Sequence, residues 1–209
     1  MAAADRLVWI DLEMTGLDPA TDEIVEIACI VTEADLTEID SGISLVVKPS
    51  DEPLAKMDDV VVRMHTDSGL LDEIPSGIEL ADAETQVLEY VKSHIPEARK
   101  APLAGSSVYV DRGFLSAYMP ALDAHLHYRL VDVSSIKELA RRWFPRVYFA
   151  TPEKNGNHRA LGDIRESIAE LRYYRDAMFV PHPGPDSPTA QALGQNHIVD
   201  HSTPDVPTL

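Results

Sequence analysis

The chain has 209 residues, 44% of them hydrophobic and 25% charged, which is the composition of one ordinary globular domain that needs no disulfide or structural metal for stability. Asp and Glu number 35 against 18 Lys and Arg, and the net charge of -17 excludes a protein that binds long duplex nucleic acid through a broad basic surface. The single cysteine excludes an internal disulfide. Because the sequence has neither an apolar run of roughly 18 residues nor a secretion signal, we expect a soluble, cytoplasmic protein.

The N-terminal third alternates strand-like runs with turns. Residues 7–11 and 43–47 are short apolar runs, and the β-branched run 24–31 is nearly all apolar, which is typical of a strand covered on both faces. Residues 16–19 carry the glycine and proline of a turn. The short connections predict three antiparallel strands at the start of a sheet.

Helical periodicity dominates the rest of the domain. Ser135 and Glu138 have the spacing of a capping box at the start of one helix. Residues 103–108 and 131–133 are candidate buried strands. The predicted helices cover residues 87–95, 135–143 and 158–178. Strands first and strand–helix units afterwards predict an α/β domain with a mixed sheet flanked by helices.

The last segment, 181–209, differs in composition from the rest. It holds six of the chain's 15 prolines and has little apolar periodicity. We therefore predict a single domain over residues 1–180, followed by a Pro-rich tail that is extended or disordered.

Asp11 and Glu13 lie two residues apart at the end of the first strand, so their side chains point to the same face. Their neighbours are apolar. Two carboxylates in such a setting repel each other, and each is driven to bind a proton or a cation. Oxygen ligands of this kind suit Mg²⁺ or Mn²⁺. The alternative is a pair of solvated acids at a strand end.

Three further residues become candidates for the active site only when they are considered together. Asp111, taken alone, is typical of a helix N-cap or a surface ion pair. His158 and Asp163 open the last predicted helix. A separation of five residues would set them roughly 140° apart on a helix. They can therefore line one site only if His158 lies at or before the first turn, which the preceding loop-like residues 154–157 allow.

Together these residues resemble the DEDDh family of 3′-to-5′ exonucleases. Five segments are also similar to the branch of that family that degrades very short RNA: residues 9–18, 64–70, 126–129, 132–143 and 163–167. The resemblance covers about residues 5–180. It implies a ribonuclease H-like fold and hydrolysis of very short RNA, especially 5′-phosphorylated dinucleotides, to 5′-mononucleotides.

The resemblance also implies two divalent cations, Mg²⁺ or Mn²⁺. The four carboxylates that match the family's metal ligands are Asp11, Glu13, Asp111 and Asp163, and His158 matches its general base. The cations would activate a water and stabilise the leaving 3′-oxygen, while His158 takes the proton of that water.

Contacts with the bases, and contacts across a homodimer, follow from the same resemblance. Leu17 matches a residue that wedges against the bases, and His65 matches one that lines the substrate pocket. Tyr128 matches a residue that reaches over from the second subunit of a homodimer. The alternative for Leu17 is a place in the core. Val60 departs from the family, which often has an aromatic residue at this position.

Three residues match groups that hold the 5′-phosphate of a dinucleotide, namely Ser107, Arg129 and Ser134. The alternative for Ser134 is a helix N-cap. Ser106 stands where the family often has asparagine, and this change leaves the hydroxyl of Ser107 in place.

Two other functions compete with this one. An exonuclease that acts on long 3′ ends would share the chemistry, but following a long strand usually requires a basic groove, which the net charge disfavours. A catalytically inactive module that binds dinucleotides would not need all five catalytic positions to hold competent residues. Release of mononucleotides from a labelled dinucleotide in the presence of Mn²⁺ distinguishes an enzyme from such a module.

Overall fold

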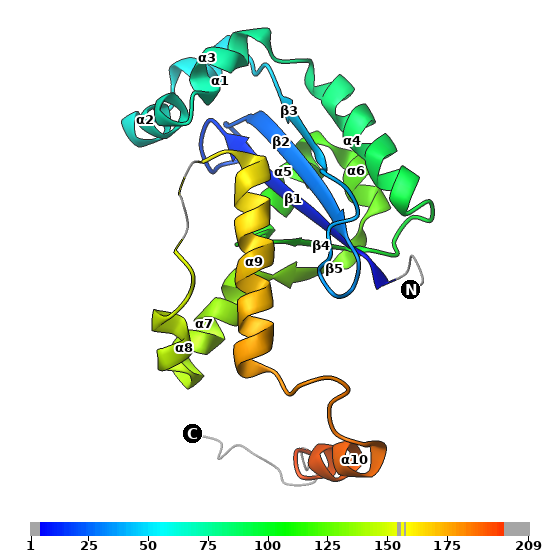
Figure 1. Cartoon of the computed structure of the whole chain (residues 1–209). Helices are drawn as coiled ribbons and strands as arrows, with labels where there is room; N and C mark the ends of the chain where they lie inside the picture. Colours follow the sequence, from blue (N-terminus) through cyan, green and yellow to red (C-terminus); the bar gives the residue numbers. More distant parts are fainter. Residues whose placement is uncertain (1–4, 154–155, 157, 199–209) are drawn as a thin grey trace, which may run out of the picture.

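The computed structural model describes residues 5–153, 156 and 158–198. Its five strands form one sheet in the order β3-β2-β1-β4-β5, with β1 antiparallel to β2, β2 antiparallel to β3, and β4 parallel to both β1 and β5 (Figure 1). The strands are β1 (Leu7–Met14), β2 (Ile24–Thr32), β3 (Ile43–Val46), β4 (Pro102–Gly105) and β5 (His127–Asp132). The mixed sheet and the antiparallel start that the sequence predicts are both confirmed.

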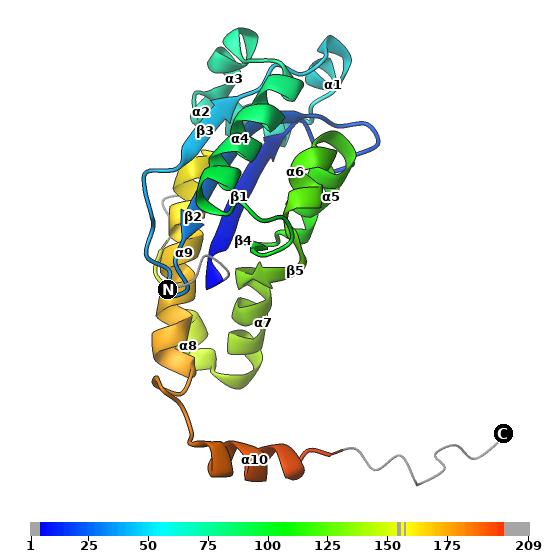
Figure 2. The ribbon, with the colours of Figure 1, turned by 90° about the vertical axis from the view of Figure 1, so that its right-hand side faces the viewer.

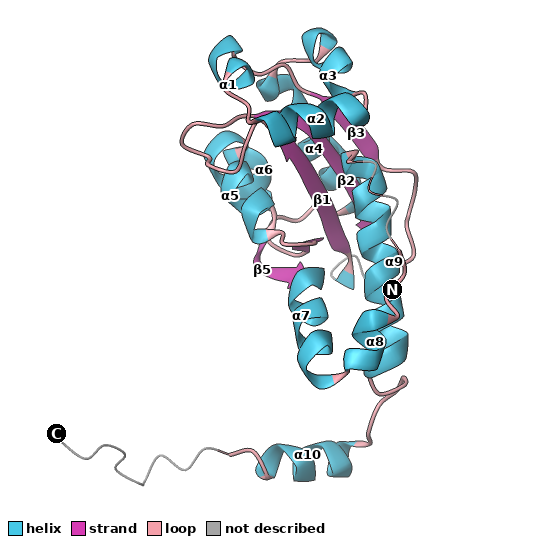
Figure 3. Ribbon diagram, turned by 90° about the vertical axis from the view of Figure 1, so that its left-hand side faces the viewer, coloured by secondary structure: helices cyan, strands magenta, loops and turns pink. Residues whose placement is uncertain are grey.

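Helices cover both faces of the sheet and one of its ends. Helices α4, α5 and α6 lie on one face, α7 and α9 on the other, and α1 to α3 at the end where β1 finishes (Figures 2 and 3). Their bounds are α1 (Asp51–Ala55), α2 (Asp59–Asp67), α3 (Leu70–Glu73), a 3₁₀ turn (Ile74–Ser76), α4 (Leu80–His94), α5 (Tyr109–Tyr118), α6 (Pro120–His125), α7 (Val133–Trp143), α8 (Pro145–Phe149), α9 (Ala160–Met178) and α10 (Ser187–Gln195).

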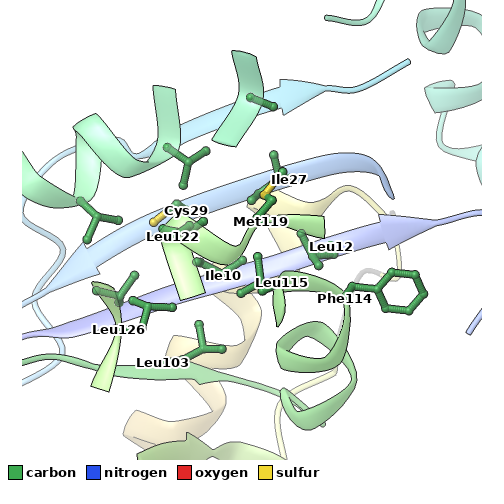
Figure 4. Close-up of a cluster of buried hydrophobic side chains, with 14 of the residues drawn as sticks. Ile10, Leu12, Ile27, Cys29, Leu103, Phe114, Leu115, Met119, Leu122 and Leu126 are labelled. Atoms are coloured by element: carbon green, nitrogen blue, oxygen red, sulfur yellow. The ribbon is translucent and has the colours of Figure 1, made fainter. Parts of the chain in front are cut away.

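Strand β1 sends alternate side chains into two different cores. Ile10 and Leu12 pack in the cluster that α4, α5 and α6 cover (Figure 4). Trp9 belongs to the cluster under α7 and α9, where its indole N–H donates to Thr32 Oγ1 at 3.0 Å. Because side chains alternate along a strand, Asp11 lies on the Trp9 face and so points toward α9.

Strand β2 is the most deeply buried element, since all nine of its residues are buried, as its apolar composition predicts. One of the nine is acidic. Glu26 pairs with Glu13 in the β1–β2 register and retains 1% of its exposure. An acidic side chain in this position needs hydrogen-bonding partners, because a buried charge is costly unless it is paired.

Helix α7 begins earlier than the predicted capping box allows. Its N-cap is Asp132, whose carboxylate accepts a hydrogen bond from the backbone N–H of Ser134. Ser135 lies inside the helix and donates its hydroxyl to the same carboxylate at 2.7 Å. The prediction of a capping box formed by Ser135 and Glu138 is therefore wrong, as is the alternative that Ser134 is the N-cap.

The segment after residue 180 contains a helix that the sequence pattern does not indicate. Residues 187–195 form α10, where Asp186 caps the helix by accepting from the backbone N–H of Thr189. None of its residues is buried, and it lies apart from the sheet in two views (Figures 1 and 2). The tail is therefore not extended over these residues, while residues 199–209 lie outside the described part. Among the described residues, no helix combines the length and the apolar character that crossing a bilayer requires.

Candidate active site

The four predicted metal-binding carboxylates come from three elements. Asp11 and Glu13 lie on β1, Asp111 lies in the first turn of α5, and Asp163 lies in the first turn of α9. The start of α9 lies near α2, at the end of the sheet where β1 finishes (Figure 1). Asp111 is the third residue of α5, so it is not an N-cap. Its carboxylate accepts a hydrogen bond from the backbone N–H of Leu12 at 3.0 Å, which places it between Asp11 and Glu13.

His158 lies before the first residue of α9. It can therefore line the same site as Asp163, which the five-residue separation allows only for a residue at or before the first turn. The side chains of Glu13, His158 and Asp163 each offer one ligand atom, and these three atoms lie within 4.8 Å of one another. His158 is exposed and has a left-handed backbone, with φ at 47°. Such a conformation is uncommon for residues other than glycine and is concentrated at functional sites.

Burial and mutual repulsion raise the pKa values of the acidic group. Burial is the main cause for Glu13, whose pKa rises to about 8, with further contributions from Asp163 and Glu26. Burial and the charge of Asp111 raise the pKa of Asp11 well above its usual value. Burial also raises the pKa of Asp111 to about 7, although the hydrogen bond from the backbone of Leu12 opposes this rise.

These shifts argue against the alternative of two solvated acids at a strand end, since Glu13 retains only 7% of its exposure. Carboxylates that raise one another's pKa are stabilised by a bound proton or a bound cation. The carboxylate oxygens of this group therefore fit a divalent cation.

His65 is fully buried in α2 and also faces this group. Its Nε2 lies 2.9 Å from the carbonyl oxygen of Met14, so Nε2 donates and carries the ring hydrogen. The other nitrogen, Nδ1, has no hydrogen-bond partner and lies 3.9 Å from Glu13 Oε2. A buried nitrogen without a partner, next to the carboxylates, is suited to contact a ligand.

Leu17 lies at the tip of the turn after β1 and is 74% exposed, so it does not belong to the core. Two hydrogen bonds to the carboxylate of Asp22 hold this turn in place. Thr15 Oγ1 donates to Asp22 Oδ1 at 3.0 Å, and the backbone N–H of Asp18 donates to Asp22 Oδ2 at 2.9 Å. A Cβ on Gly16 would lie 2.4 Å from Asp22 Oδ2, so a larger residue there would displace the carboxylate that holds the turn. Leu17 is thus an exposed apolar side chain on an ordered turn.

Ser107, in the loop after β4, lies next to Ser134, in the first turn of α7, with their hydroxyl oxygens 3.0 Å apart. Asp132 joins the two segments, because its Oδ1 accepts from the backbone N–H of Ser107 at 2.8 Å and of Ser134 at 3.2 Å. The backbone of Ser107 is left-handed, with φ at 54°. Both serines line a hollow of about 470 Å³ together with Glu138 and Arg142.

Arg129 lies beside Tyr128 rather than beside these serines. Its Nε donates to the Tyr128 hydroxyl at 3.2 Å, and its guanidinium carbon lies 5.6 Å from the centroid of that ring. Both residues belong to β5, an edge strand, and Tyr128 is 75% exposed. The structure therefore brings Ser107 and Ser134 together but does not join Arg129 to them within the described residues of one chain.

Sequence reasoning missed two residues that organise this region, Asp132 and Glu26. Asp132 could have been recognised as a helix N-cap, because it is an acidic residue directly before a helical pattern. Glu26 offered a clearer signal, because it is the only acidic residue in a strand of nine buried residues. A charged residue in such a strand has a buried partner or a ligand.

Comparisons with known proteins agree with this geometry. Residues 8–171 match the family RNase_T, which is described as an exonuclease family. A protein of Streptomyces avermitilis named oligoribonuclease is 60% identical over 195 residues, covering 93% of this chain and 98% of its own. Oligoribonucleases of Leifsonia xyli and Mycobacterium tuberculosis are 62% and 53% identical over 190 residues, covering 91% and 90% of this chain and 92% and 88% of theirs.

Solved structures share the fold at low sequence identity. A complex of Escherichia coli exonuclease I with single-stranded DNA has a TM-score of 0.63 at 16% identity and covers 83% of this chain. Exonuclease I from Methylocaldum szegediense has a TM-score of 0.57 at 20% identity over the same share. The chain spans about two fifths of these exonuclease I chains, 41% in both cases.

Proposed function

Since the chain belongs to the oligoribonucleases of the RNase_T exonuclease family, we infer that it is a 3′-to-5′ exoribonuclease that hydrolyses very short RNA. The reaction joins a water oxygen to the phosphorus of the last phosphodiester and breaks the bond to the 3′-oxygen, which releases a 5′-mononucleotide. The observation that carries this function is the convergence of Glu13, His158 and Asp163 at one end of the sheet.

Divalent cations are the cofactors of this proposal. Two ions, Mg²⁺ or Mn²⁺, would be held by the carboxylates of Asp11, Glu13, Asp111 and Asp163. The raised pKa values of three of them support this assignment, because a cation relieves the same repulsion that a proton relieves. When bound, such ions supply an activated water and stabilise charge on the leaving oxygen.

The chain's own residues supply the proton acceptor. An imidazole accepts protons near neutral pH, and His158 is exposed beside Glu13 and Asp163, where a water bound at the carboxylates can reach it. His65 presents its Nδ1, which has no hydrogen-bond partner among the described residues, to the same region, where it can contact a hydroxyl of the nucleotide.

The preferred substrate is a 5′-phosphorylated dinucleotide. The paired hydroxyls of Ser107 and Ser134 would bind its 5′-phosphate, and Leu17 would contact its bases. Arg129 would add a cation to the phosphate pocket. Because its guanidinium lies beside Tyr128 in one chain, this contact requires either a movement of Arg129 or its delivery by a second chain.

A homodimer would cover large aromatic side chains that are exposed in a single chain. Tyr128 and Trp143 are large side chains that remain 75% and 65% exposed, and Tyr128 would reach the site of the partner subunit. Exposed aromatic residues of this kind are enriched at protein interfaces. A cytoplasmic location completes the proposal, and the buried free thiol of Cys29 is compatible with a reducing compartment.

One experiment tests the whole proposal. Initial rates are measured with Mn²⁺ on 5′-phosphorylated RNA of two to ten nucleotides. We expect the dinucleotide to have the highest kcat/KM, with a sharp fall between two and four nucleotides, because a longer strand has no terminal phosphate at the two serines and the net charge of -17 offers the rest of the strand no attraction. Equal rates on two and ten nucleotides would indicate an exonuclease for long strands, and binding without turnover would indicate a binding module.

A further inference from the structure

Arg159, the residue directly after His158, joins two elements that are distant in sequence. Its Nη1 and Nη2 each donate to one oxygen of Glu73 at 2.9 Å, which makes a bidentate pair with the last residue of α3. Its Nη2 also donates to Glu26 Oε1 in β2 at 3.3 Å. One guanidinium therefore connects α3 with the central sheet.

Glu26 holds the start of α9 in a second way. Its Oε2 accepts from the backbone N–H of Ala160, the first residue of the helix, at 3.2 Å. Its Oε1 accepts from the hydroxyl of Ser44 in β3 at 2.9 Å. The carboxylate is buried and fully engaged, so it forms a fixed anchor for both Arg159 and the end of the helix.

Among the described residues, no hydrogen bond or ion pair holds the side chain of His158 in a comparable way. It is exposed, so packing does not hold its ring, and its left-handed backbone is a conformation that costs energy unless the surroundings enforce it. The residues that follow it, Arg159 and Ala160, are both bound to Glu26. The backbone path that aims His158 at Glu13 therefore depends on these bonds.

We propose that Arg159 is a positioning residue whose guanidinium, clamped between Glu26 and Glu73, fixes His158 in its place beside Glu13 and Asp163. The inference rests on the proposed role of His158 as the general base. Arg159 acts through His158 and does not itself contact the substrate. A misplacement of about 1 Å in a reacting group costs up to 10²-fold in rate, so the loss of this clamp is expected to lower kcat more than it changes KM.

Arg165 provides a matched control on the same helix. Its Nε pairs with Glu38 at 3.3 Å and its Nη2 donates to the carbonyl oxygen of Ser41 at 2.9 Å. It therefore ties α9 to a neighbouring loop through similar contacts, six residues further along. Arg165→Met removes a comparable ion pair without touching the residues that surround His158.

The kinetic test compares Arg159→Met, Glu73→Gln and Arg165→Met at saturating Mn²⁺ with the phosphorylated dinucleotide. We expect Arg159→Met to lower kcat about tenfold or more with KM changed less than threefold, Glu73→Gln to lower kcat by a smaller factor, and Arg165→Met to have no effect. Glu73 is half exposed, so its variant tests the clamp even if Arg159→Met fails to fold. Wild-type kcat in both Arg159→Met and Glu73→Gln would overturn the proposal.

A double-mutant cycle separates positioning from a direct effect on the carboxylates. If Arg159 acts through His158, adding Arg159→Met to His158→Ala lowers the remaining rate less than twofold. The same tenfold loss in both backgrounds would overturn the proposal. NMR of the metal-free protein supplies a second readout, in which the ring signals of His158 shift in Arg159→Met but stay unchanged in Arg165→Met.

These measurements also separate this inference from the proposed function. Wild-type activity in His158→Ala would refute the role of His158 as base, whereas unaltered His158 ring signals in Arg159→Met would refute the clamp alone.

Discussion

The backbone N–H of Leu12 donates to the carboxylate of Asp111 at 3.0 Å, across 99 residues of sequence. This bond joins β1 to α5 at the position between Asp11 and Glu13. It stabilises the ionised form of Asp111 and so partly offsets the effect of burial on its pKa. The third carboxylate is therefore held by the same strand that carries the first two.

Removing one carboxylate should abolish turnover without harming the fold. We expect Asp163→Asn to lower kcat by more than roughly 10²-fold, because even residues that only support metal ligands contribute 10–100-fold. The melting temperature of the metal-free protein should stay equal or rise, since one repelling charge is gone. Asp176→Asn, on the exposed last part of α9, is the control and should change neither quantity. Wild-type activity in Asp163→Asn would contradict the metal assignment.

The stability of the metal-free protein should fall as pH rises from about 5 to 8. Burial raises the pKa of Glu13 from 4.5 to about 8, so the folded state keeps a proton that the unfolded chain releases near pH 4.5. The stabilisation is complete below that pH and is lost as pH approaches 8. Thermal unfolding in EDTA measures it, and Mg²⁺ should reduce the slope. Parallel curves for wild type and Glu13→Gln would show that Glu13 is not the cause.

Val60 offers a gain-of-affinity test. It is 72% exposed on α2, the same helix that carries His65, so a larger side chain has room there. Stacking of a base on an aromatic side chain contributes ~1–3 kcal/mol. Val60→Trp should therefore tighten dinucleotide binding or leave it unchanged in a calorimetric titration with inactive Asp163→Asn protein. Binding at least tenfold weaker would mean that the pocket is shaped differently from that of the family.

The contribution of Arg129 should depend on the 5′-phosphate. A charge-assisted hydrogen bond to phosphate contributes ~1.5–3 kcal/mol. Arg129→Ala should thus weaken binding of the phosphorylated dinucleotide about tenfold or more, and binding of the unphosphorylated one much less. Lys100→Ala is a control at an exposed cation that pairs with Glu97. Equal losses for both ligands would remove Arg129 from the phosphate pocket.

The tail should be dispensable for both folding and catalysis. No residue of α10 is buried, so a chain that ends at residue 180 loses no core contacts of that helix. Its melting temperature and its kcat/KM on the dinucleotide should match those of the full chain. A loss in either quantity would show that the tail docks on the domain or on a second subunit.

Asp11 and Glu13 could be found from a short local pattern, because they interrupt an apolar strand. Asp111, His158 and Asp163 became candidates only in combination, through the family resemblance. Local patterns also located the strands, because a run such as 24–31 is apolar at every position except Glu26.

Features that depend on tertiary contacts could not be predicted in this way. Residues 51–76 form short helices and a 3₁₀ turn, which pack through Leu70 and Ile74 against Val25. The capping box failed for a local reason. Ser135 and Glu138 have the required spacing, but Asp132 captures the hydroxyl of Ser135 and the helix begins before it.

The alternation of β1 has a consequence for how this protein can change over evolutionary time. Ile10 and Leu12 pack in the core on one face of the sheet, while Trp9 and Glu13 lie on the opposite face. A single-residue insertion ahead of Trp9 that slipped the strand by one position would turn the acids into the cluster that holds Ile10 and Leu12, and these two side chains toward the acidic site. A length change within this strand would therefore disrupt the carboxylate pair and the core beneath it together.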